Sequence, residues 1–310
     1  MDLKHLRAFL TVADTGNVTR AAEVLHLVQP AVSRQLRLLE EDLGAPLFER
    51  ERHGMVLTEA GLALAGYARR VMMELDRARV EIAGTGTGIS GLVTLGLLPS
   101  TIDTLSSPLV TGLASTYPGI RIRIAMGYAG TLLRWLVSGE IDAALLYGAE
   151  GSPDVQTTPL IKEPLWVIGS RAAGLRRDTP VALASLAGHK LVLPSAPHGL
   201  RALVEHACAV SNVTLDIAAE TNALSVQRSL VLGGHGFTIL PPIAVADDLQ
   251  AQKLSGAPLV DPPVARTIVL ALPANRPSGR HVRCAVDLLV GEAKKAVVSG
   301  AWPEAQWLGP

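Results

Sequence analysis

Three polar side chains, Gln29, Ser33 and Arg37, recur every four residues along one stretch of the chain. In a helix this spacing places them on a single face. Amide, hydroxyl and guanidinium groups form the hydrogen bonds that base edges and phosphates offer in the major groove of DNA. The pattern therefore predicts a DNA-contacting face, and the alternative is that these residues form only the solvated side of a surface helix.

The residues around this face predict a helix-turn-helix motif. Asn17 can cap a helix over residues 18–25, and residues 26–28 form a short turn. A second helix then begins at Gln29-Pro30, where the missing N–H of proline does no harm, and ends at Gly44. One apolar stripe marks the buried side of this second helix: Val32, Leu36, Leu39 and Leu43.

A hairpin and a long helix are predicted after this motif. The hairpin spans about residues 47–57, and its tip at 51–54 is placed to reach phosphates or a minor groove. Thr58 can cap a helix over about 59–83. The apolar residues of this helix follow spacings of four and three: Leu64, Ala68, Val71, Leu75, Ala78 and Ile82. Such a heptad seam predicts pairing with the same helix of a second subunit, and the alternative is a helix that packs only on its own domain.

A second set of polar residues follows predicted strands beyond the glycine-rich tether at 84–91. In open α/β sheets, ligands bind outside the carboxyl ends of the strands, where helix N-termini present free N–H groups. The predicted effector-binding residues at such ends are Ser100, Thr101, Gly130, Thr131, Tyr147, Ser195, His198, Thr221 and Asn222. The alternative is that the hydroxyls only cap helices and that His198 and Asn222 only satisfy backbone groups of their loops.

The region beyond the tether alternates β-rich and helical runs, which predicts βαβ units around mainly parallel sheets. The predicted strands are 92–97, 121–126, 143–146, 165–168, 190–193, 215–219, 237–240 and 266–272. Two passages of the chain, near residues 162 and 267, are expected to link two lobes with a cleft between them. Residues 302–310 have no clear period and are predicted to lie loosely on the surface.

Composition and missing motifs exclude several classes of protein. The 310 residues include 28 basic and 28 acidic side chains, so bulk positive charge does not drive DNA binding. The chain has no HExxH, Walker A or GxSxG motif, its GxGxxG at 86–91 lies between a helix and a strand, and Cys208 and Cys284 stand far apart. The sequence therefore predicts no enzyme, no cofactor and no metal. Because no apolar signal segment begins the chain, a cytoplasmic protein without a membrane partner is expected.

The N-terminal region resembles the LysR-type transcriptional regulators, a family of winged helix-turn-helix proteins. The resemblance rests on Ala21-Ala22, Leu25, the run Gln29-Pro30-Ala31-Val32-Ser33-Arg34-Gln35-Leu36, Leu39-Glu40, Leu43-Gly44, Leu47-Phe48, Arg50, Leu57-Thr58 and Ala60-Gly61. The predicted DNA contacts are Arg20 in the first helix of the motif, Gln29, Pro30, Ser33, Arg34 and Arg37 on the recognition helix, and Arg50, Arg52 and His53 on or beside the wing. One departure is Val28, where the family usually has a serine that can cap the recognition helix or contact a phosphate.

The resemblance covers nearly the full length and implies a linker helix for dimerisation and a two-lobed α/β effector domain similar to periplasmic solute-binding proteins. The predicted domains are a winged helix-turn-helix (1–58), a linker helix and tether (59–90), lobe I (91–162 plus 267–298), lobe II (163–266) and a tail (299–310).

Residues 126–136 loosely resemble the branch of the family associated with nitrogen assimilation control. Together these patterns predict a regulator that binds double-stranded DNA as a homodimer or homotetramer and responds to a small-molecule effector, an organic anion rather than a cation. The alternatives are a solute-binding or a catalytic α/β domain fused to a DNA-binding module.

Overall fold

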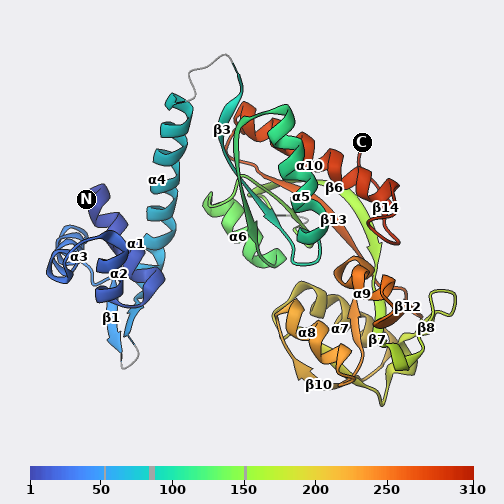
Figure 1. The fold of residues 1–310 in the computed structure, drawn as a ribbon. Coiled ribbons are helices and arrows are strands. Elements are labelled where there is room, and N and C mark those ends of the chain that lie inside the picture. The colour runs from blue at the N-terminus through green and yellow to red at the C-terminus, as the bar shows by residue number, and fades with distance from the viewer. Residues whose placement is uncertain (52–53, 84–87, 150–151) are drawn as a thin grey trace. The chain divides into compact units, whose positions relative to one another are not determined.

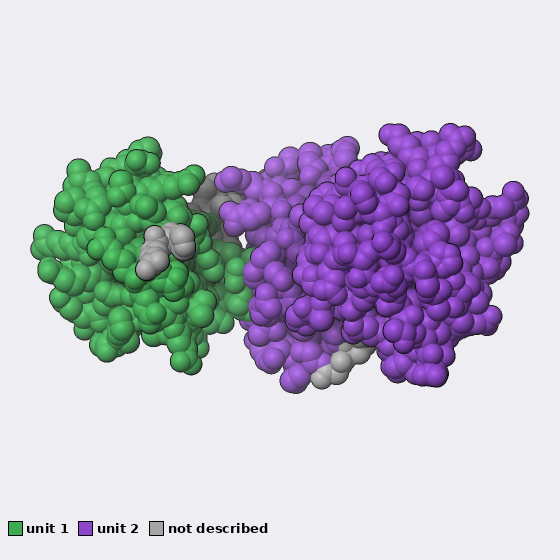
Figure 2. Space-filling view, turned by 90° about the horizontal axis from the view of Figure 1, so that it is seen from below, with its two compact units in different colours: residues 1–86, 138–140 green, residues 87–137, 141–310 purple. Residues whose placement is uncertain are grey.

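A computed structural model describes residues 1–51, 54–83, 88–149 and 152–310. The predicted DNA contacts Arg52 and His53 lie outside these residues, as does part of the predicted tether. The chain divides into two compact units, coloured separately in Figure 2. Unit 1 comprises residues 1–86 with 138–140, and unit 2 comprises 87–137 with 141–310.

Unit 1 is a winged helix-turn-helix with a long helix at its end (Figure 1). Its elements are α1 (Leu3–Thr15), α2 (Val18–Leu25), α3 (Gln29–Leu43), β1 (Phe48–Glu51), β2 (Gly54–Leu57) and α4 (Glu59–Ala83). The predicted caps are confirmed: the Asn17 side chain accepts from the N–H groups of Thr19 and Arg20, and Gly44 ends α3 at a φ of 69°. The strands pair as the predicted antiparallel hairpin.

Lobe I, which combines the beginning and the end of unit 2, is built on a six-stranded sheet in the order β14-β6-β13-β5-β3-β4. Its strands are β3 (Ser90–Leu97), β4 (Gly119–Met126), β5 (Ala143–Leu146), β6 (Val155–Pro164), β13 (Ala265–Pro273) and β14 (Gln306–Trp307), and its helices are α5 (Ile102–Thr116), α6 (Ala129–Ser138) and α10 (Arg280–Val298). The connections from β3 to β4 and from β4 back to β5 cross the sheet in opposite directions. Right-handed crossovers therefore place α5 and α6 on opposite faces, as Figure 1 shows.

Lobe II, the middle part of unit 2, has its own apolar core and its own sheets. Its strands are β7 (Trp166–Ser170), β8 (Val181–Ala182), β9 (Lys190–Leu193), β10 (Asp216–Glu220), β11 (Thr238–Leu240) and β12 (Leu254–Val260). Its helices are α7 (Gly199–Ser211), α8 (Leu224–Leu232) and α9 (Ala246–Gln250), with the 3-10 turns η1 (Arg171–Ala173), η2 (Leu183–Leu186) and η3 (Pro242–Val245). The chain enters lobe II from β6 into β7 and leaves it from β12 into β13.

The prediction of mainly parallel sheets is wrong. In lobe I only β3 pairs in parallel with its neighbours, whereas β6, β13 and β14 join the sheet through antiparallel pairs. The reason is the double passage between the lobes. Because the chain leaves lobe I along β6 and returns along β13, these adjacent strands run in opposite directions.

The prediction of a loose C-terminal tail is also wrong. Trp302 is 1% exposed and belongs to the core of lobe I, and β14 pairs with β6 at the edge of the sheet. Burial of one indole ring holds the segment in place even though the sequence around it has no periodicity.

Among the described residues, no helix is both long and apolar enough to cross a membrane. The same residues contain no cluster of His, Cys, Asp or Glu side chains suited to a metal ion.

Candidate nucleic-acid interface and interlobe cavity

The first turns of α3 present polar groups to solvent. Gln29 and Pro30 are exposed, Ser33 is half-buried, and Arg34 and Arg37 are exposed on the same part of the helix surface. The Gln29 amide nitrogen donates a hydrogen bond to the Ser33 hydroxyl at 2.9 Å. Since an amide has two N–H donors and a carbonyl acceptor, this bond leaves one donor and the carbonyl oxygen available to a base edge.

Two further arginines near α3 in the sequence are exposed, and one glutamate of α3 holds the neighbouring hairpin in place. Arg20 on α2 and Arg50 on β1 are exposed. Glu40 accepts the backbone N–H of Leu47 at 2.8 Å and so anchors the start of the hairpin. Val28 caps α3 without any side-chain hydrogen bond and is 69% exposed. The first turn of α3 is therefore less firmly held than that of α2.

Only part of the predicted seam on α4 is available to a second subunit, because its first residues pack against unit 1. Thr58 caps the helix as predicted, since its hydroxyl accepts the Gly61 N–H at 3.0 Å. Ala68 of the seam is buried together with Ala65 in the core of unit 1, which means that the start of α4 packs on its own domain. Val71, one turn further, is exposed. The side chain of Ile82 lies outside the described part of the structure.

A small cavity lies between lobe I and lobe II. Five of the predicted effector-binding residues line it: Ser100, Tyr147, His198, Thr221 and Asn222. They come from the ends of strands and the starts of helices, as the prediction for an open α/β sheet requires. Asn222 also accepts the backbone N–H of Ser195 at 3.0 Å, so its amide holds a loop as well as facing the cavity.

The other four predicted residues do not line this cavity. Thr101 is fully buried and its hydroxyl donates to the Leu98 carbonyl at 3.2 Å, so it neither faces a ligand nor caps α5 through its side chain. Gly130 is exposed on α6, and Thr131 faces an adjoining groove. Ser195 donates its backbone N–H to Asn222 and is not among the residues that line the cavity.

The sequence analysis missed a buried ion pair at the site, of which Arg266 lines the cavity. The Nε of Arg266 lies 2.6 Å from Oε1 of Glu163, and the two side chains are 4% and 0% exposed. Arg266 also donates from Nη2 to the Ser100 hydroxyl at 2.7 Å, and its guanidinium lies 4.8 Å from the centre of the Tyr147 ring. Behind the pair, Nε1 of Trp302 donates to Oε2 of Glu163 at 2.7 Å.

A signal for this pair was present in the sequence. Arg266 lies in β13 just before its apolar run, and Glu163 is the residue before the last of β6. Arginine and glutamate are almost never fully buried unless they are paired. Both occur where the chain passes between the lobes, so the two crossover strands carry the pair between them.

His198 brings a hydrogen-bond donor to the cavity. Its Nδ1 accepts the Leu200 N–H at 3.2 Å, so in the neutral imidazole the proton sits on Nε2. Among the described residues Nε2 has no hydrogen-bond partner although it is buried. Burial first, and then the nearby charge of Arg266, lower the pKa of His198 to about 4, so the ring is neutral near pH 7.

The cavity is small as it stands. Its free volume is about 30 Å³, enough for water but far from the roughly 300–1,000 Å³ of typical ligand pockets. Apolar side chains complete its walls, among them Leu98, Leu200, Leu224 and Leu240. An organic ligand can enter only if the lobes or the side chains between them move.

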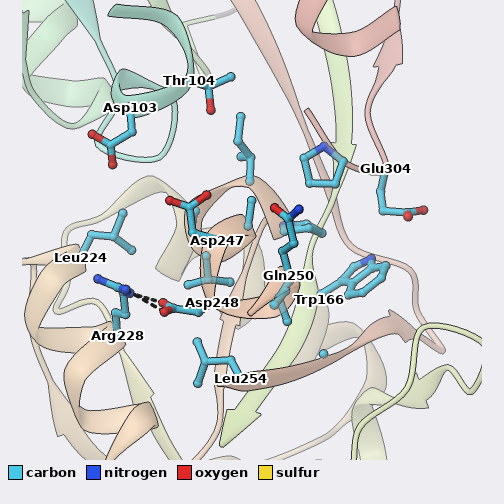
Figure 3. A pocket seen from close by; sticks show the side chains of 18 of the residues that line it. Asp103, Thr104, Trp166, Leu224, Arg228, Asp247, Asp248, Gln250, Leu254 and Glu304 are labelled. Atoms are coloured by element: carbon cyan, nitrogen blue, oxygen red, sulfur yellow. Dashed lines mark hydrogen bonds and ion pairs between the residues drawn. The ribbon is translucent and has the colours of Figure 1, made fainter. Parts of the chain in front are cut away.

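A much larger open groove of about 1750 Å³ adjoins the cavity, with which it shares Pro99, Tyr128, Leu224 and Ala244 as lining residues (Figure 3). Asp103 of α5 and Asp247 of α9 face it, and Arg228 forms an ion pair with Asp248 in its wall. The hydrogen bond from Arg228 lowers the pKa of Asp248 in spite of its burial. Glu304 at its rim pairs with Arg177 at 2.6 Å. In this groove the structure shows ion pairs, whereas the buried donor without a partner belongs to the cavity.

A winged helix-turn-helix followed by a two-lobed α/β domain defines a class of DNA-binding transcriptional regulators that carry a ligand-binding domain. Residues 3–62 match the family model described as "Bacterial regulatory helix-turn-helix protein, lysR family", and residues 86–294 match the "LysR substrate binding domain". The chain belongs to the LysR family of transcriptional regulators.

Curated relatives agree with this assignment. The transcriptional regulator BbuR of Bordetella bronchiseptica is 30% identical over 303 residues, which cover 98% of this chain and 93% of that protein. The nitrogen assimilation regulatory protein of Klebsiella aerogenes is 30% identical over 261 residues, covering 83% and 82%. These relatives are transcriptional regulators and not enzymes, in line with the missing catalytic motifs. A regulator of nitrogen assimilation is among them, as residues 126–136 indicated.

Solved structures show the same fold. CbnR, a LysR family transcriptional regulator, is 21% identical with a TM-score of 0.72, and the match covers 94% of this chain and 99% of that one. A full-length OxyR variant from Pseudomonas aeruginosa is 26% identical with a TM-score of 0.62 and covers 95% of both chains.

Proposed function

We propose that this LysR-type regulator recognises its operator through the exposed N-terminal half of α3. Gln29 and Ser33 contact base edges as a hydrogen-bonded pair. Around them, the residues proposed to position the helix on the DNA backbone are Pro30, Arg34, Arg37, Arg20, Arg50, Arg52 and His53. The observation that carries the proposal is the 2.9 Å bond from Gln29 to Ser33, which fixes the amide on the helix surface. Glutamine held in this way suits the N6 and N7 edge of adenine.

Selection of duplexes from a random library by the full-length protein tests this proposal. The enriched sequences are then footprinted with the wild-type protein and with Gln29→Ala. We expect Gln29→Ala to lose its base preference at one position in each half-site, and to keep its preference at base positions that α3 does not contact. Identical sequence preferences in both proteins would contradict base contact by Gln29.

For the effector we propose a small organic anion that binds between the lobes. Ser100 of lobe I, whose hydroxyl already accepts from Arg266, would use its own O–H and the nearby positive charge to hold an oxygen of the ligand. From lobe II, the Nε2 donor of His198 has no partner in the described structure and is available to a second oxygen, with Thr221 and Asn222 beside it.

The effector site is tested by thermal-shift screening of the full-length protein with a panel of small organic acids and their amides. Compounds that stabilise the wild type are titrated against Ser100→Ala, with Ser115→Ala, an exposed serine of α5, as the matched control. Loss of a hydrogen bond to a charged ligand is worth ~1.5–3 kcal/mol, about a 10- to 100-fold rise in Kd. Equal affinity of Ser100→Ala and the control would show that the effector binds elsewhere.

We further propose that the protein works in the cytoplasm as a homodimer formed through α4, and as a homotetramer where two dimers occupy one operator. The support is the exposed apolar surface that remains on α4, which includes Leu62, Tyr67 and Val71. A charge at Val71 would stand opposite its own copy across the seam. Light scattering is expected to show dissociation of Val71→Asp and no change for Val298→Asp, an exposed valine at the end of α10. A dimeric Val71→Asp protein would contradict the seam.

A further inference from the structure

A series of hydrogen bonds joins the wall of the interlobe cavity to the C-terminal end of the chain. Arg266 lines the cavity, whereas Glu163 is not among its lining residues. Oε1 of Glu163 accepts from Nε of Arg266 at 2.6 Å, and Oε2 of the same carboxylate accepts from Nε1 of Trp302 at 2.7 Å. At the cavity end, Nη2 of Arg266 donates to the Ser100 hydroxyl at 2.7 Å. Three bonds therefore lie between a hydroxyl in the cavity wall and an indole near the C-terminus.

The middle of this series is closed to water. Trp302 is 1% exposed, and the side chains of Glu163 and Arg266 are 0% and 4% exposed. A buried polar group that loses its partner is not compensated by solvent. A change at one bond of the series is therefore met by movement at the next bond.

The carboxylate of Glu163 is held by a donor at each oxygen. The last torsion of a glutamate side chain has no sharp preferred angle, so hydrogen bonds and packing decide how the carboxylate is turned. The indole N–H of Trp302 fixes one oxygen, which leaves the other directed at Nε of Arg266. The guanidinium, which lies 4.8 Å from the centre of the Tyr147 ring, takes its orientation in turn from that oxygen.

The C-terminal segment, residues 299–310, lies along the strand that carries Glu163. β14 pairs with β6 one and two residues before Glu163, and the N–H of Leu308 donates to the Leu160 carbonyl at 2.7 Å. The backbone N–H of Trp302 donates to a carbonyl of α10 at 2.9 Å. The segment is thus tied to lobe I on both sides of the indole, which fixes the place of the indole N–H.

We propose that Trp302 is a positioning residue of the effector site: acting through Glu163, it holds the guanidinium of Arg266 towards the cavity. The C-terminal segment and the cavity then respond to each other. An anionic effector at Ser100, which is the part that rests on the proposed function, competes with Glu163 for the N–H groups of Arg266. A shift of the guanidinium reaches the indole through the carboxylate, so effector binding is coupled to the C-terminal segment.

This coupling exists without a ligand, so it is measured by fluorine NMR of the ligand-free, full-length protein. The chain has four tyrosines and four tryptophans, so each fluorinated amino acid gives four signals, which single substitutions assign. In fluorotyrosine-labelled protein we expect Trp302→Phe to shift the Tyr147 signal by more than its linewidth, because the Tyr147 ring lies against Arg266. Trp307→Phe is the matched control, since the N–H of this indole bonds within the C-terminal segment, and it should leave the Tyr147 signal in place.

The opposite direction is measured in fluorotryptophan-labelled protein. Ser100→Ala removes the bond at the cavity end, and we expect the Trp302 signal to shift by more than its linewidth while the Trp307 signal stays in place. Ser115→Ala, at an exposed serine of α5, should shift neither signal. In Glu163→Gln, which keeps the size of the side chain and removes its charge, Ser100→Ala should no longer shift the Trp302 signal.

The proposal is overturned if the Tyr147 signal is the same in Trp302→Phe and Trp307→Phe, or if the Trp302 signal is the same in Ser100→Ala and Ser115→Ala. If Trp302→Phe does not fold, the serine variants decide alone. A shift caused by Ser100→Ala that persists in Glu163→Gln would also overturn it, because the change would then reach the indole through packing. An effector that binds elsewhere would contradict the proposed effector site and leave these results unchanged.

Discussion

On α3 the polar groups lie four residues apart along one helix, whereas those of the interlobe cavity surround a buried ion pair and come from distant parts of the chain. The bond that joins Ser100 to Arg266 links residues 166 positions apart, and the bond that joins Gln29 to Ser33 links residues four apart. On α3 the polar groups keep hydrogen-bonding capacity for a partner. In the cavity Ser100 is already bonded to Arg266 and Asn222 to the backbone of Ser195, whereas the Nε2 donor of His198 has no partner among the described residues.

Because of this difference, substitutions on α3 should change DNA binding, whereas substitutions at buried residues of the cavity should change the stability of the fold. An exposed polar residue can be removed from α3 with little effect on folding, because water replaces its bonds. A buried residue of the cavity cannot be removed in the same way, because its partner is left without a bond in a place that water does not reach. Substitutions in the two regions should therefore have different consequences.

The largest effect is expected for Glu163→Ala. It leaves the buried guanidinium of Arg266 without its carboxylate, and breaking a buried pair in this way typically costs ~3–5 kcal/mol of stability. Urea unfolding followed by tryptophan fluorescence measures it, because all four tryptophans, Trp135, Trp166, Trp302 and Trp307, lie in unit 2.

The control for this prediction is Asp178→Ala, which removes a pair with Arg176 whose two side chains are mostly exposed. Surface pairs contribute little because water and salt screen them, so no measurable change is expected. A loss of less than ~1 kcal/mol in Glu163→Ala would show that the two regions do not differ as described.

A smaller effect, confined to DNA binding, is expected for Gln29→Ala. Specific binding should weaken by ~1–3 kcal/mol while binding to random duplexes and the thermal unfolding midpoint stay unchanged. Fluorescence anisotropy on selected and random duplexes measures both affinities. Gln35→Ala serves as control, since Gln35 lies on the same helix but away from the Gln29 stripe. Equal losses on both kinds of duplex would mean that Gln29 contacts only the DNA backbone.

Val28→Ser should produce a still smaller change, in the opposite direction. A serine at the start of α3 can accept the N–H of Ala31, because Pro30 has none, and such a cap stabilises a helix by ~1 kcal/mol. We expect slower amide exchange at Ala31 and tighter operator binding. The same substitution at Val24, an exposed residue within α2, creates no cap and should give no gain. If Val28→Ser and Val24→Ser behave alike, the cap is not what α3 lacks.

The last expected effect, which grows as the pH falls, is a change in how the stability of unit 2 depends on pH. His198 has a folded-state pKa of about 4, below the 6.5 of an ordinary histidine, so between these values the unfolded chain binds a proton that the folded chain does not. The free energy of unfolding should therefore fall as the pH drops from 6.5 towards 4, and be insensitive to this residue above 6.5. Unfolding of the wild type and of His198→Gln across this range measures the effect; identical slopes would place His198 in a solvated environment.

Local structure was largely predictable from the sequence. The caps at Asn17, Thr58 and Gly44 act within a few residues of their own position, and the apolar stripe of α3 follows from helical geometry alone. The DNA-contacting face, which is a proposal for this chain, could be derived in the same way because all of its residues share one helix. Resemblance to the LysR family added the identity of the fold, and the family models agree with it.

The cavity depended on tertiary structure. Thr101 and Ser100 are neighbours with similar side chains, yet one hydroxyl bonds to the Leu98 carbonyl inside lobe I and the other faces Arg266. Nothing local decides between these directions, because the choice depends on where β13 lies after the chain has passed through lobe II.

The same dependence on distant parts of the chain explains the other features that the sequence analysis missed or predicted wrongly. The partner of Glu163 and the burial of Trp302 are set by strands paired over more than a hundred residues, as is the antiparallel order of β6 and β13. Sequence periodicity reports how a residue is placed relative to its near neighbours along one helix or strand. Only the packed fold decides which distant side chain the residue meets and whether water can reach the pair. The charge state and the hydrogen bonds of a buried site depend on both.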